Sequence, residues 1–121
     1  MTFCHHMDIL FKRKKDRQLA NNESKLKKEF RGNPRRSKLI RARLDELADV
    51  DDLAAMRSLP QAYCHELKGS RAGQLVVKLD KGSRMVFEVA NAPIPRKPDG
   101  GLDWSQVTSI RILELAEDYH D

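Results

Sequence analysis

Two stretches of this 121-residue chain carry side chains that can act on a phosphodiester. The first is the C-terminal run Asp118-Tyr-His120, in which an acid, a phenol and an imidazole follow one another directly. The second contains His65, followed by Lys68 and Arg71 on either side of a glycine. If the fold brings the two stretches together, two imidazoles, a phenol and two cations share one site. Such a set of groups suits the cleavage of RNA.

Metal-independent cleavage of RNA uses the neighbouring 2′-hydroxyl as the nucleophile. The enzyme then needs a base for that hydroxyl, an acid for the leaving 5′-oxygen, and cations that offset the charge of the transition state. Histidine, with an unperturbed pKa of about 6.5, serves as acid or base near neutrality. His65 and His120 could therefore divide these roles in either order. The candidates for stabilising the phosphate charge are Arg84, Lys68 and Arg71.

Each of these residues also has an ordinary structural interpretation. A single histidine in a strand or loop is commonly a satisfied polar residue, and the two cations beside the glycine could be solvated. Arg84 could be a cross-strand partner of Glu88 or Glu114. Tyr119 could stack on a base, position the hydroxyl, or pack as a core or interface aromatic. Asp118 is better suited to orienting a histidine or a basic residue than to acting as a base, because an ordinary Asp is only weakly basic at pH 7.

The positive charge is concentrated in the first third of the chain. The net charge is +5, yet residues 1–43 hold fourteen Lys and Arg against four Asp and Glu. Such asymmetry favours a polyanionic partner, nucleic acid before membrane, although a solvated helix surface is the alternative. Contacts of this kind go to phosphates and carry no sequence preference. The helix cations expected to contact RNA are Lys25, Lys27, Lys28, Arg35, Arg36, Arg41 and Arg43.

The remaining composition limits the class of protein. The chain has the length of a single domain (1–121), and no apolar run is long enough for a membrane span or a signal-peptide core. Cys4 and Cys64 have no metal-ligand or disulfide-framework spacing, so we expect free thiols, a reducing cytoplasm, and no cofactor. Residues 1–6 look like a leader before Met7, and we expect no metal site at their cysteine and histidines.

Hydrophobic periodicity predicts a short strand followed by two helices. Residues 8–11 have strand character, and Asp16 is expected to cap a helix that runs to about Arg31 and stops at Gly32. Asn33-Pro34 is typical of a second helix start. That helix carries apolar residues at helical spacing to about residue 48, with a break and a fresh cap expected within 49–52 and an end at residue 60.

From residue 61 the apolar period changes from helical spacing to two. Alternating residues predict strands over 75–80 and 85–90 around a turn at 81–83, and a last strand over 107–115. Residues 92–101 hold three prolines and two glycines and are expected to form a loop, with Trp104 folded back over the edge of the sheet. The expected fold is α+β, with the N-terminal strand and the two-helix hairpin packed on one face of an antiparallel sheet.

The order and spacing of several blocks resemble the HigB-type toxins of the RelE/ParE superfamily. The blocks are the short strand, the basic helical hairpin, Leu67-Lys-Gly-Ser-Arg-Ala-Gly73, Arg84-Met-Val-Phe87 and the closing Asp-Tyr-His, and they span residues 7–120. The resemblance implies a toxin of a type II toxin–antitoxin system. Such a toxin is an mRNA interferase, a ribosome-dependent endoribonuclease that cuts messages during translation. Its implied partners are the ribosome, mRNA and a helix-turn-helix antitoxin.

The family's cleavage residues map onto His65, Arg84 and the terminal Asp118-Tyr-His120. Two features depart from the pattern: the loop over residues 91–106 is long, and Asp121 extends the chain. The first would change partner contacts, and the second would place carboxylates near the imidazole and favour its protonated form. Two alternatives stay open. One is a catalytically silent binding module of the same fold that acts as a partner, suppressor or RNA-binding regulator, and the other is a gyrase-poisoning relative.

Overall fold

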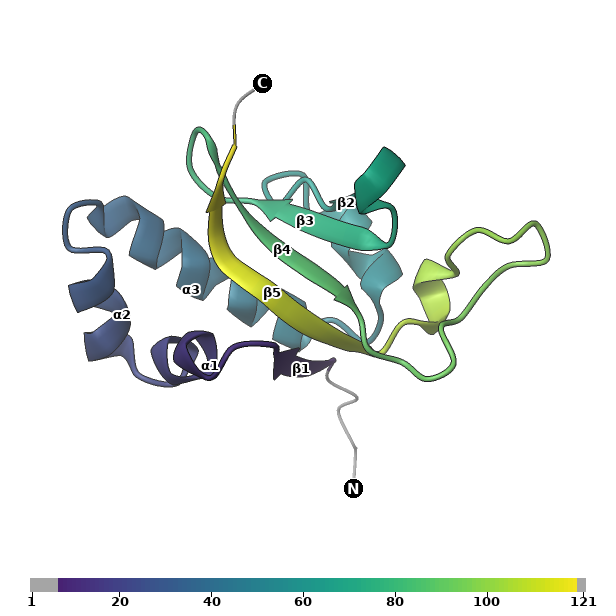
Figure 1. Ribbon diagram of the computed structural model, residues 1–121, viewed down its shortest axis with the longest axis horizontal. Coiled ribbons are helices and arrows are strands. Elements are labelled where there is room, and N and C mark those ends of the chain that lie inside the picture. The colour runs from purple at the N-terminus through teal and green to yellow at the C-terminus, as the bar shows by residue number, and fades with distance from the viewer. Residues whose placement is uncertain (1–6, 120–121) are drawn as a thin grey trace.

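A mixed five-stranded sheet forms the centre of the protein. The computed structural model describes residues 7–119, so the expectations for the leader 1–6, for His120 and for Asp121 lie outside the described residues. The strand order is β1-β5-β4-β3-β2 (Figure 1). The bounds are β1 (Asp8–Phe11), β2 (His65–Glu66), β3 (Gln74–Lys78), β4 (Ser83–Val89) and β5 (Ser109–Asp118).

Strands β2 to β5 pair in antiparallel fashion, but β1 pairs with β5 in parallel. The α+β class is confirmed, whereas the expectation of an antiparallel sheet is wrong at this edge. The N-terminal strand also does not pack on a face of the sheet as expected but is its edge strand. The reason for the parallel pairing is that β1 and β5 are the first and last strands of the chain. They are neighbours in the sheet, but every other element comes between them in the sequence. No hairpin turn joins these strands, so only the packing of the core sets their relative direction.

The expected first helix is two helices. The structure has α1 (Lys14–Ala20) and α2 (Glu23–Glu29), separated by two asparagines. The side chain of Asn22 caps α2 by accepting a hydrogen bond from the backbone N–H of Lys25. Asp16 is a buried residue inside α1 instead of its cap, and it is paired with Arg13 at 2.9 Å. Asparagine favours caps over helix interiors because its amide competes for backbone hydrogen bonds, which explains the break.

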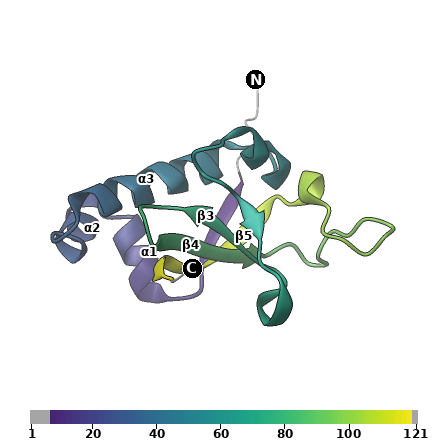
Figure 2. The same cartoon turned by 90° about the horizontal axis from the view of Figure 1, so that it is seen from above.

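The second predicted helix is confirmed as α3 (Pro34–Asp49). Asn33 caps it through the backbone N–H of Arg36, with Pro34 in the first turn. The expected fresh cap is Asp52, which begins the 3-10 helix η1 (Leu53–Ser58). Figure 2 shows α3 along one side of the sheet. The buried residues that these helices contribute to the core are Ile40, Leu44, Leu47, Leu53 and Met56.

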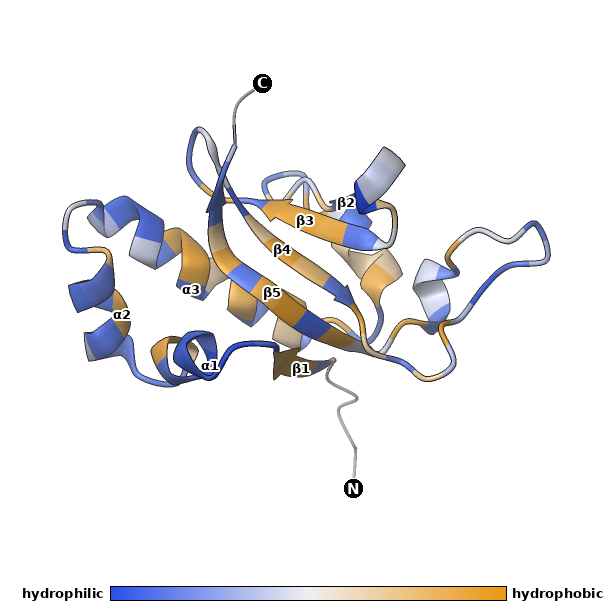
Figure 3. Cartoon of the chain, in the orientation of Figure 1, coloured by the Kyte–Doolittle hydropathy of each residue, from blue (hydrophilic) through white to orange (hydrophobic). Residues whose placement is uncertain are grey.

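One face of the sheet packs against the helices, and the other is open. The alternate residues of β3 and β4 on the helix side, Leu75, Val77, Met85 and Phe87, belong to the core cluster. Colouring by hydropathy shows apolar strands beside mainly hydrophilic α1 and α2 (Figure 3). Val76 and Val86 face each other in register on the open side and are still only 1% exposed. Polar side chains of the open face must therefore lie over them.

The long connection after β4 folds against the end of η1. Trp104 opens the 3-10 helix η3 (Trp104–Gln106), is 8% exposed, and lies 4.0 Å beneath the guanidinium of Arg57. Trp104 therefore contacts η1 through Arg57 and also belongs to the core cluster. Within residues 7–119 no helix is both long enough and apolar enough to cross a membrane.

A candidate phosphate-binding site on the open face of the sheet

Two arginines from distant parts of the chain meet on the open face at one carboxylate. Arg84 of β4 donates from Nε to Oε2 of Glu117 at 2.8 Å. Arg71, at the end of the 3-10 helix η2 (Gly69–Arg71), lies 2.9 Å from Oε1 of the same carboxylate through Nη1. The sequence predicted both arginines as phosphate ligands, and the fold places them side by side.

Two irregularities in β5 put Glu117 where it can receive these bonds. The register runs from Phe87 opposite Ile112, to Val86 opposite Glu114, to Arg84 opposite Glu117, so β5 holds extra residues at two points. Each β-bulge turns the following side chains to a different face. The alternation read from the sequence could not reveal this, because it assumes an uninterrupted period of two.

Each arginine has a second anchor besides Glu117. Arg71 donates from Nε to the side-chain carbonyl of Gln74 at 2.9 Å. The guanidinium of Arg84 lies 4.7 Å from the ring centre of Tyr119, a cation–π distance. The ring is held in turn by the backbone, since the N–H of Tyr119 donates to the carbonyl of Gly82 in the β3–β4 turn at 2.9 Å. Tyr119 therefore supports the Arg84 guanidinium from the side.

Asp118 also contacts a basic residue, but one on a helix. Its carboxylate lies 3.2 Å from Nη1 of Arg36, whose Nε donates to Asp80 at 3.0 Å. Burial by itself would raise the pKa of Asp80, but the hydrogen bonds from Arg36 and Asn33 hold it below its ordinary value. This cluster ties the start of α3 to the β3–β4 turn and to the end of β5.

His65 lies on the same face, at the β2 edge. In register it is opposite Val76, which is opposite Val86, so its strand is two strands away from that of Arg84, or about 10 Å across the sheet. Its Nδ1 lies 2.9 Å from the carbonyl oxygen of Tyr63. A carbonyl only accepts, so Nδ1 carries the proton and Nε2 of the neutral ring has the free lone pair. Nε2 is therefore the atom able to take a proton from a substrate.

Two neighbours of His65 were missed or left undefined by the sequence. Tyr63 is 63% exposed, has a φ of +44°, and places its ring 4.5 Å from the imidazole. An exposed aromatic beside a histidine suits base stacking, and its strained backbone had no local sequence signal.

Burial raises the pKa of the Cys64 thiol to about 12, against a small opposing effect of Arg57. Cys64 is a neutral thiol at physiological pH and not a nucleophile.

A hollow of about 350 Å³ lies in front of the arginine cluster. Its charged lining residues are Lys12 and Arg13, which connect β1 to α1, and Arg71, Glu114 and Glu117. The sequence analysis placed Lys12 and Arg13 only in a general basic stretch. Lys68, a predicted phosphate ligand, is exposed directly before η2. The chain thus brings more cations to this hollow than the motifs alone indicated.

The seven helix cations predicted to contact RNA fall into two groups. Arg36, Arg41 and Arg43 make structural contacts, and Arg43, only 6% exposed, is a correction to the prediction because it cannot reach a surface phosphate. Lys27 pairs with Glu23 at 3.3 Å. The cations of this set that form no ion pair within the described chain are Lys25, Lys28 and Arg35.

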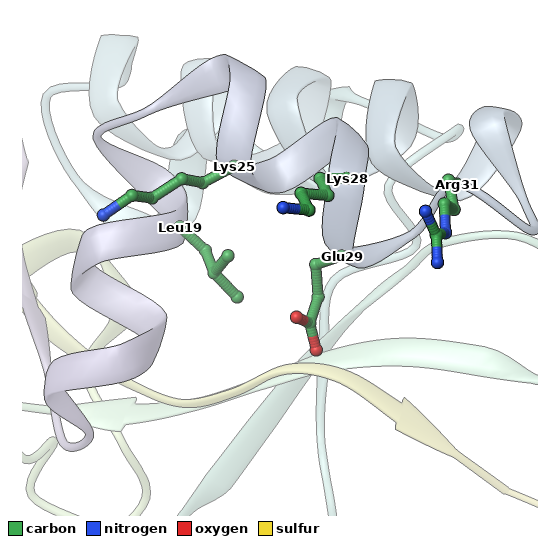
Figure 4. A pocket seen from close by; sticks show the side chains of 5 residues that line it. All are labelled: Leu19, Lys25, Lys28, Glu29 and Arg31. Carbon is green, nitrogen blue, oxygen red and sulfur yellow. The ribbon is translucent and has the colours of Figure 1, made fainter.

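Lys25 and Lys28 lie at a second hollow, between α1 and α2. Its volume is about 430 Å³, and its other lining residues are Leu19, Glu29 and Arg31 (Figure 4). Glu29 is engaged by Lys15 at 3.1 Å. The surface is therefore basic but shallow, as suits contacts with a polyanion backbone. Among residues 7–119 no group of three or more His, Cys, Asp and Glu side chains is placed to hold a metal ion.

Comparison with known proteins adds no relative to this geometry. No family model matches the chain, and neither a curated protein nor a solved structure matches it. The resemblance to HigB-type toxins therefore stands on the sequence blocks alone, and the site stands on its own contacts.

Proposed function

We propose that this protein is a ribosome-dependent endoribonuclease, the toxin of a type II toxin–antitoxin system. The observation that supports the proposal best is the meeting of Arg71 and Arg84 at one point of the open face, with Tyr119 beside them. Two guanidiniums directed at one anionic group suit a phosphodiester and its more highly charged transition state. His65 on the same face supplies the imidazole that such a reaction needs.

The proposed chemistry assigns one role to each of these groups. Nε2 of His65 accepts the proton of the 2′-hydroxyl as its oxygen attacks the adjacent phosphorus. Arg84 and Arg71 offset the charge that builds on the non-bridging oxygens. The leaving 5′-oxygen takes a proton from His120, which follows Tyr119 in the chain and lies outside the described residues. The opposite division of roles between the two imidazoles is chemically equivalent, and a bell-shaped pH–rate profile is expected in either case.

Ribosome and antitoxin binding belong to the same proposal. Lys25, Lys28 and Arg35 supply exposed positive charge away from the arginine cluster. Phosphate contacts of this type would hold the protein on ribosomal RNA without reading its sequence. A helix-turn-helix antitoxin would cover the protein and block one or both surfaces.

The test is cleavage of a message in a purified translation system, with and without ribosomes. Arg84→Ala is the informative variant, and Arg111→Ala is its matched control. Both arginines lie on the open face and each is paired with one strand neighbour, since Arg111 bonds Glu88 at 2.9 Å. We expect Arg84→Ala to slow cleavage by about 10²- to 10³-fold, the usual cost of removing one charge stabiliser. Arg111→Ala should cleave at the wild-type rate.

His65→Ala and His120→Ala complete the test. Each should abolish cleavage, and His65→Ala should leave the melting temperature nearly unchanged because His65 does not belong to the core cluster. If the protein also cuts naked RNA, it is still an endoribonuclease, but its mechanism does not require the ribosome. If folded wild-type protein, free of antitoxin, cuts no message under either condition, the endoribonuclease proposal fails.

One observation favours a second candidate, a silent binding module. Both guanidiniums are already engaged by Glu117, so the cluster is a closed set of ion pairs as it stands. A silent module should bind ribosomes or RNA through the Lys25 and Lys28 surface without cutting a message, and its expression alone should be harmless. The same assay separates the two candidates.

A further inference from the structure

One carboxylate at the hollow on the open face serves two arginines, and a second carboxylate, Glu114, also lines the hollow. Arg71 and Arg84 share the single carboxylate of Glu117, whose side chain is 21% exposed. Lys12, which lines the hollow, forms no ion pair within the part of the chain that the structure describes. By contrast, the neighbouring pair of Arg111 and Glu88 on the same face is one to one.

Each of the two arginines has a partner besides Glu117. Gln74 fixes Nε of Arg71, and the ring of Tyr119 lies against the guanidinium of Arg84. If the carboxylate leaves, both guanidiniums keep an anchor. Arg71 lines the hollow itself, and Arg84 adjoins it through the position that Glu117 fills. A phosphate group offers oxygens at spacings similar to those of a carboxylate, and guanidinium binds either anion in two-point fashion.

We propose that the hollow is a binding site for a backbone phosphate of single-stranded nucleic acid, and that Glu117 occupies the phosphate position until the ligand displaces it. Lys12, which lines the same hollow, contacts the flanking part of the strand. The proposal deepens the function proposed above and takes RNA as its ligand from there, but phosphate binding itself requires no cleavage.

The ionisation of Glu117 agrees with such competition. Burial by itself would raise its pKa, but hydrogen bonds and charge from Arg84 and Arg71 hold it below the ordinary range. The carboxylate is therefore charged at neutral pH and competes with any incoming anion. Since the cluster is partly exposed, water and ligand reach it, and the exchange of one anion for another leaves no buried charge without a partner.

Glu117→Gln tests the proposal, with Glu88→Gln as the matched control. Both changes remove one negative charge from an arginine-paired glutamate on the same face. The probe is a labelled single-stranded 2′-deoxy decanucleotide, which lacks the nucleophile for self-cleavage, followed by fluorescence anisotropy at several salt concentrations. We expect Glu117→Gln to bind about tenfold more tightly than wild type, and Glu88→Gln to stay within about twofold. The salt dependence should steepen only for Glu117→Gln, by about one phosphate contact.

A second variant shows where the extra affinity arises. Adding Arg71→Ala to Glu117→Gln should return the affinity to about the wild-type value, because the freed guanidinium is then missing. Melting curves for all variants establish that each is folded. An equal gain for both single variants would show general electrostatics only, and an unchanged or weaker affinity for Glu117→Gln would show that Glu117 positions the arginines. Either result overturns the proposal.

Inorganic phosphate distinguishes the source of the ligand. The Nε–H signal of Arg84 in ¹H–¹⁵N spectra reports on the position that Glu117 now fills. It should shift with the oligonucleotide at far lower concentration than with inorganic phosphate. A shift with inorganic phosphate alone would overturn the nucleic-acid assignment. If Glu117→Gln binds the oligonucleotide more tightly but the wild-type protein cuts no message, the endoribonuclease proposal fails and the phosphate-binding proposal stands.

Discussion

Arg43 gives the sharpest test of how the basic residues divide between structure and binding. Its guanidinium donates from Nε to the carbonyl of Lys78 at 2.7 Å and from Nη2 to the carbonyl of Gln61 at 3.0 Å. Nη1 lies 3.1 Å from the carboxylate of Glu46. This one side chain links α3 to the end of β3 and to the segment before β2.

The cost of Arg43→Ala can be worked from these contacts. A hydrogen bond to a charged group contributes about 1.5–3 kcal/mol, and removal of one partner of a buried pair costs about 3–5 kcal/mol. The substitution also leaves two backbone carbonyls, at Lys78 and Gln61, without their donor. Because these costs overlap, we expect a loss of about 4 kcal/mol in the free energy of unfolding. At an m-value of about 2 kcal/mol/M, the urea midpoint falls by about 2 M.

The assay is urea unfolding followed by circular dichroism, with Arg35→Ala as the control. Arg35 is on the same helix, is exposed, and forms no ion pair within the described residues. It should change stability by less than about 0.5 kcal/mol. A loss below about 1 kcal/mol for Arg43→Ala would refute the reasoning that this cation is structural.

Three further outcomes follow from the structure. Asp80→Asn should reduce the loss of unfolding free energy at acid pH. The pKa of Asp80 is lowered in the folded state, so the ionised carboxylate stabilises the fold above about pH 4. That stabilisation is lost as the pH falls through the folded-state pKa. Lys25→Ala with Lys28→Ala should weaken RNA binding and reduce its salt slope by about 1–2, with stability unchanged. Tyr63→Gly should raise stability by about 1 kcal/mol, because glycine adopts the positive φ without strain, and should slow message cleavage.

Each of these outcomes has a measurement that can contradict it. Urea unfolding between pH 3 and pH 7 should show a smaller pH dependence for Asp80→Asn, and an equal dependence would remove Asp80 from the linkage. Filter binding at several salt concentrations tests the double lysine variant, and a fall in its melting temperature would make those lysines structural. A lower melting temperature for Tyr63→Gly would mean that the ring contact with His65 outweighs the backbone strain.

Local signals in the sequence were strong enough for most elements. Asn33-Pro34 predicted the start of α3 because the cap and the proline act within four residues. The turn between β3 and β4 was predicted from Gly82, whose φ of +80° needs that residue. The break between α1 and α2 was missed although Asn22 marks it, because the apolar spacing on either side continues at helical intervals.

The sequence alone determined the α+β class, the basic N-terminal third, and the side chains that can act on a phosphodiester. Only the tertiary structure decided which of them meet. Arg71 and Arg84 share Glu117 because two bulges in β5 change its register. Arg43, by contrast, is buried and hydrogen-bonds to a backbone carbonyl inside the fold. The physical reason is that chain spacing determines local geometry, but the pairing of charges depends on contacts between residues as distant in the chain as Arg36 and Asp118. Those contacts form only when the core has set the register of the sheet.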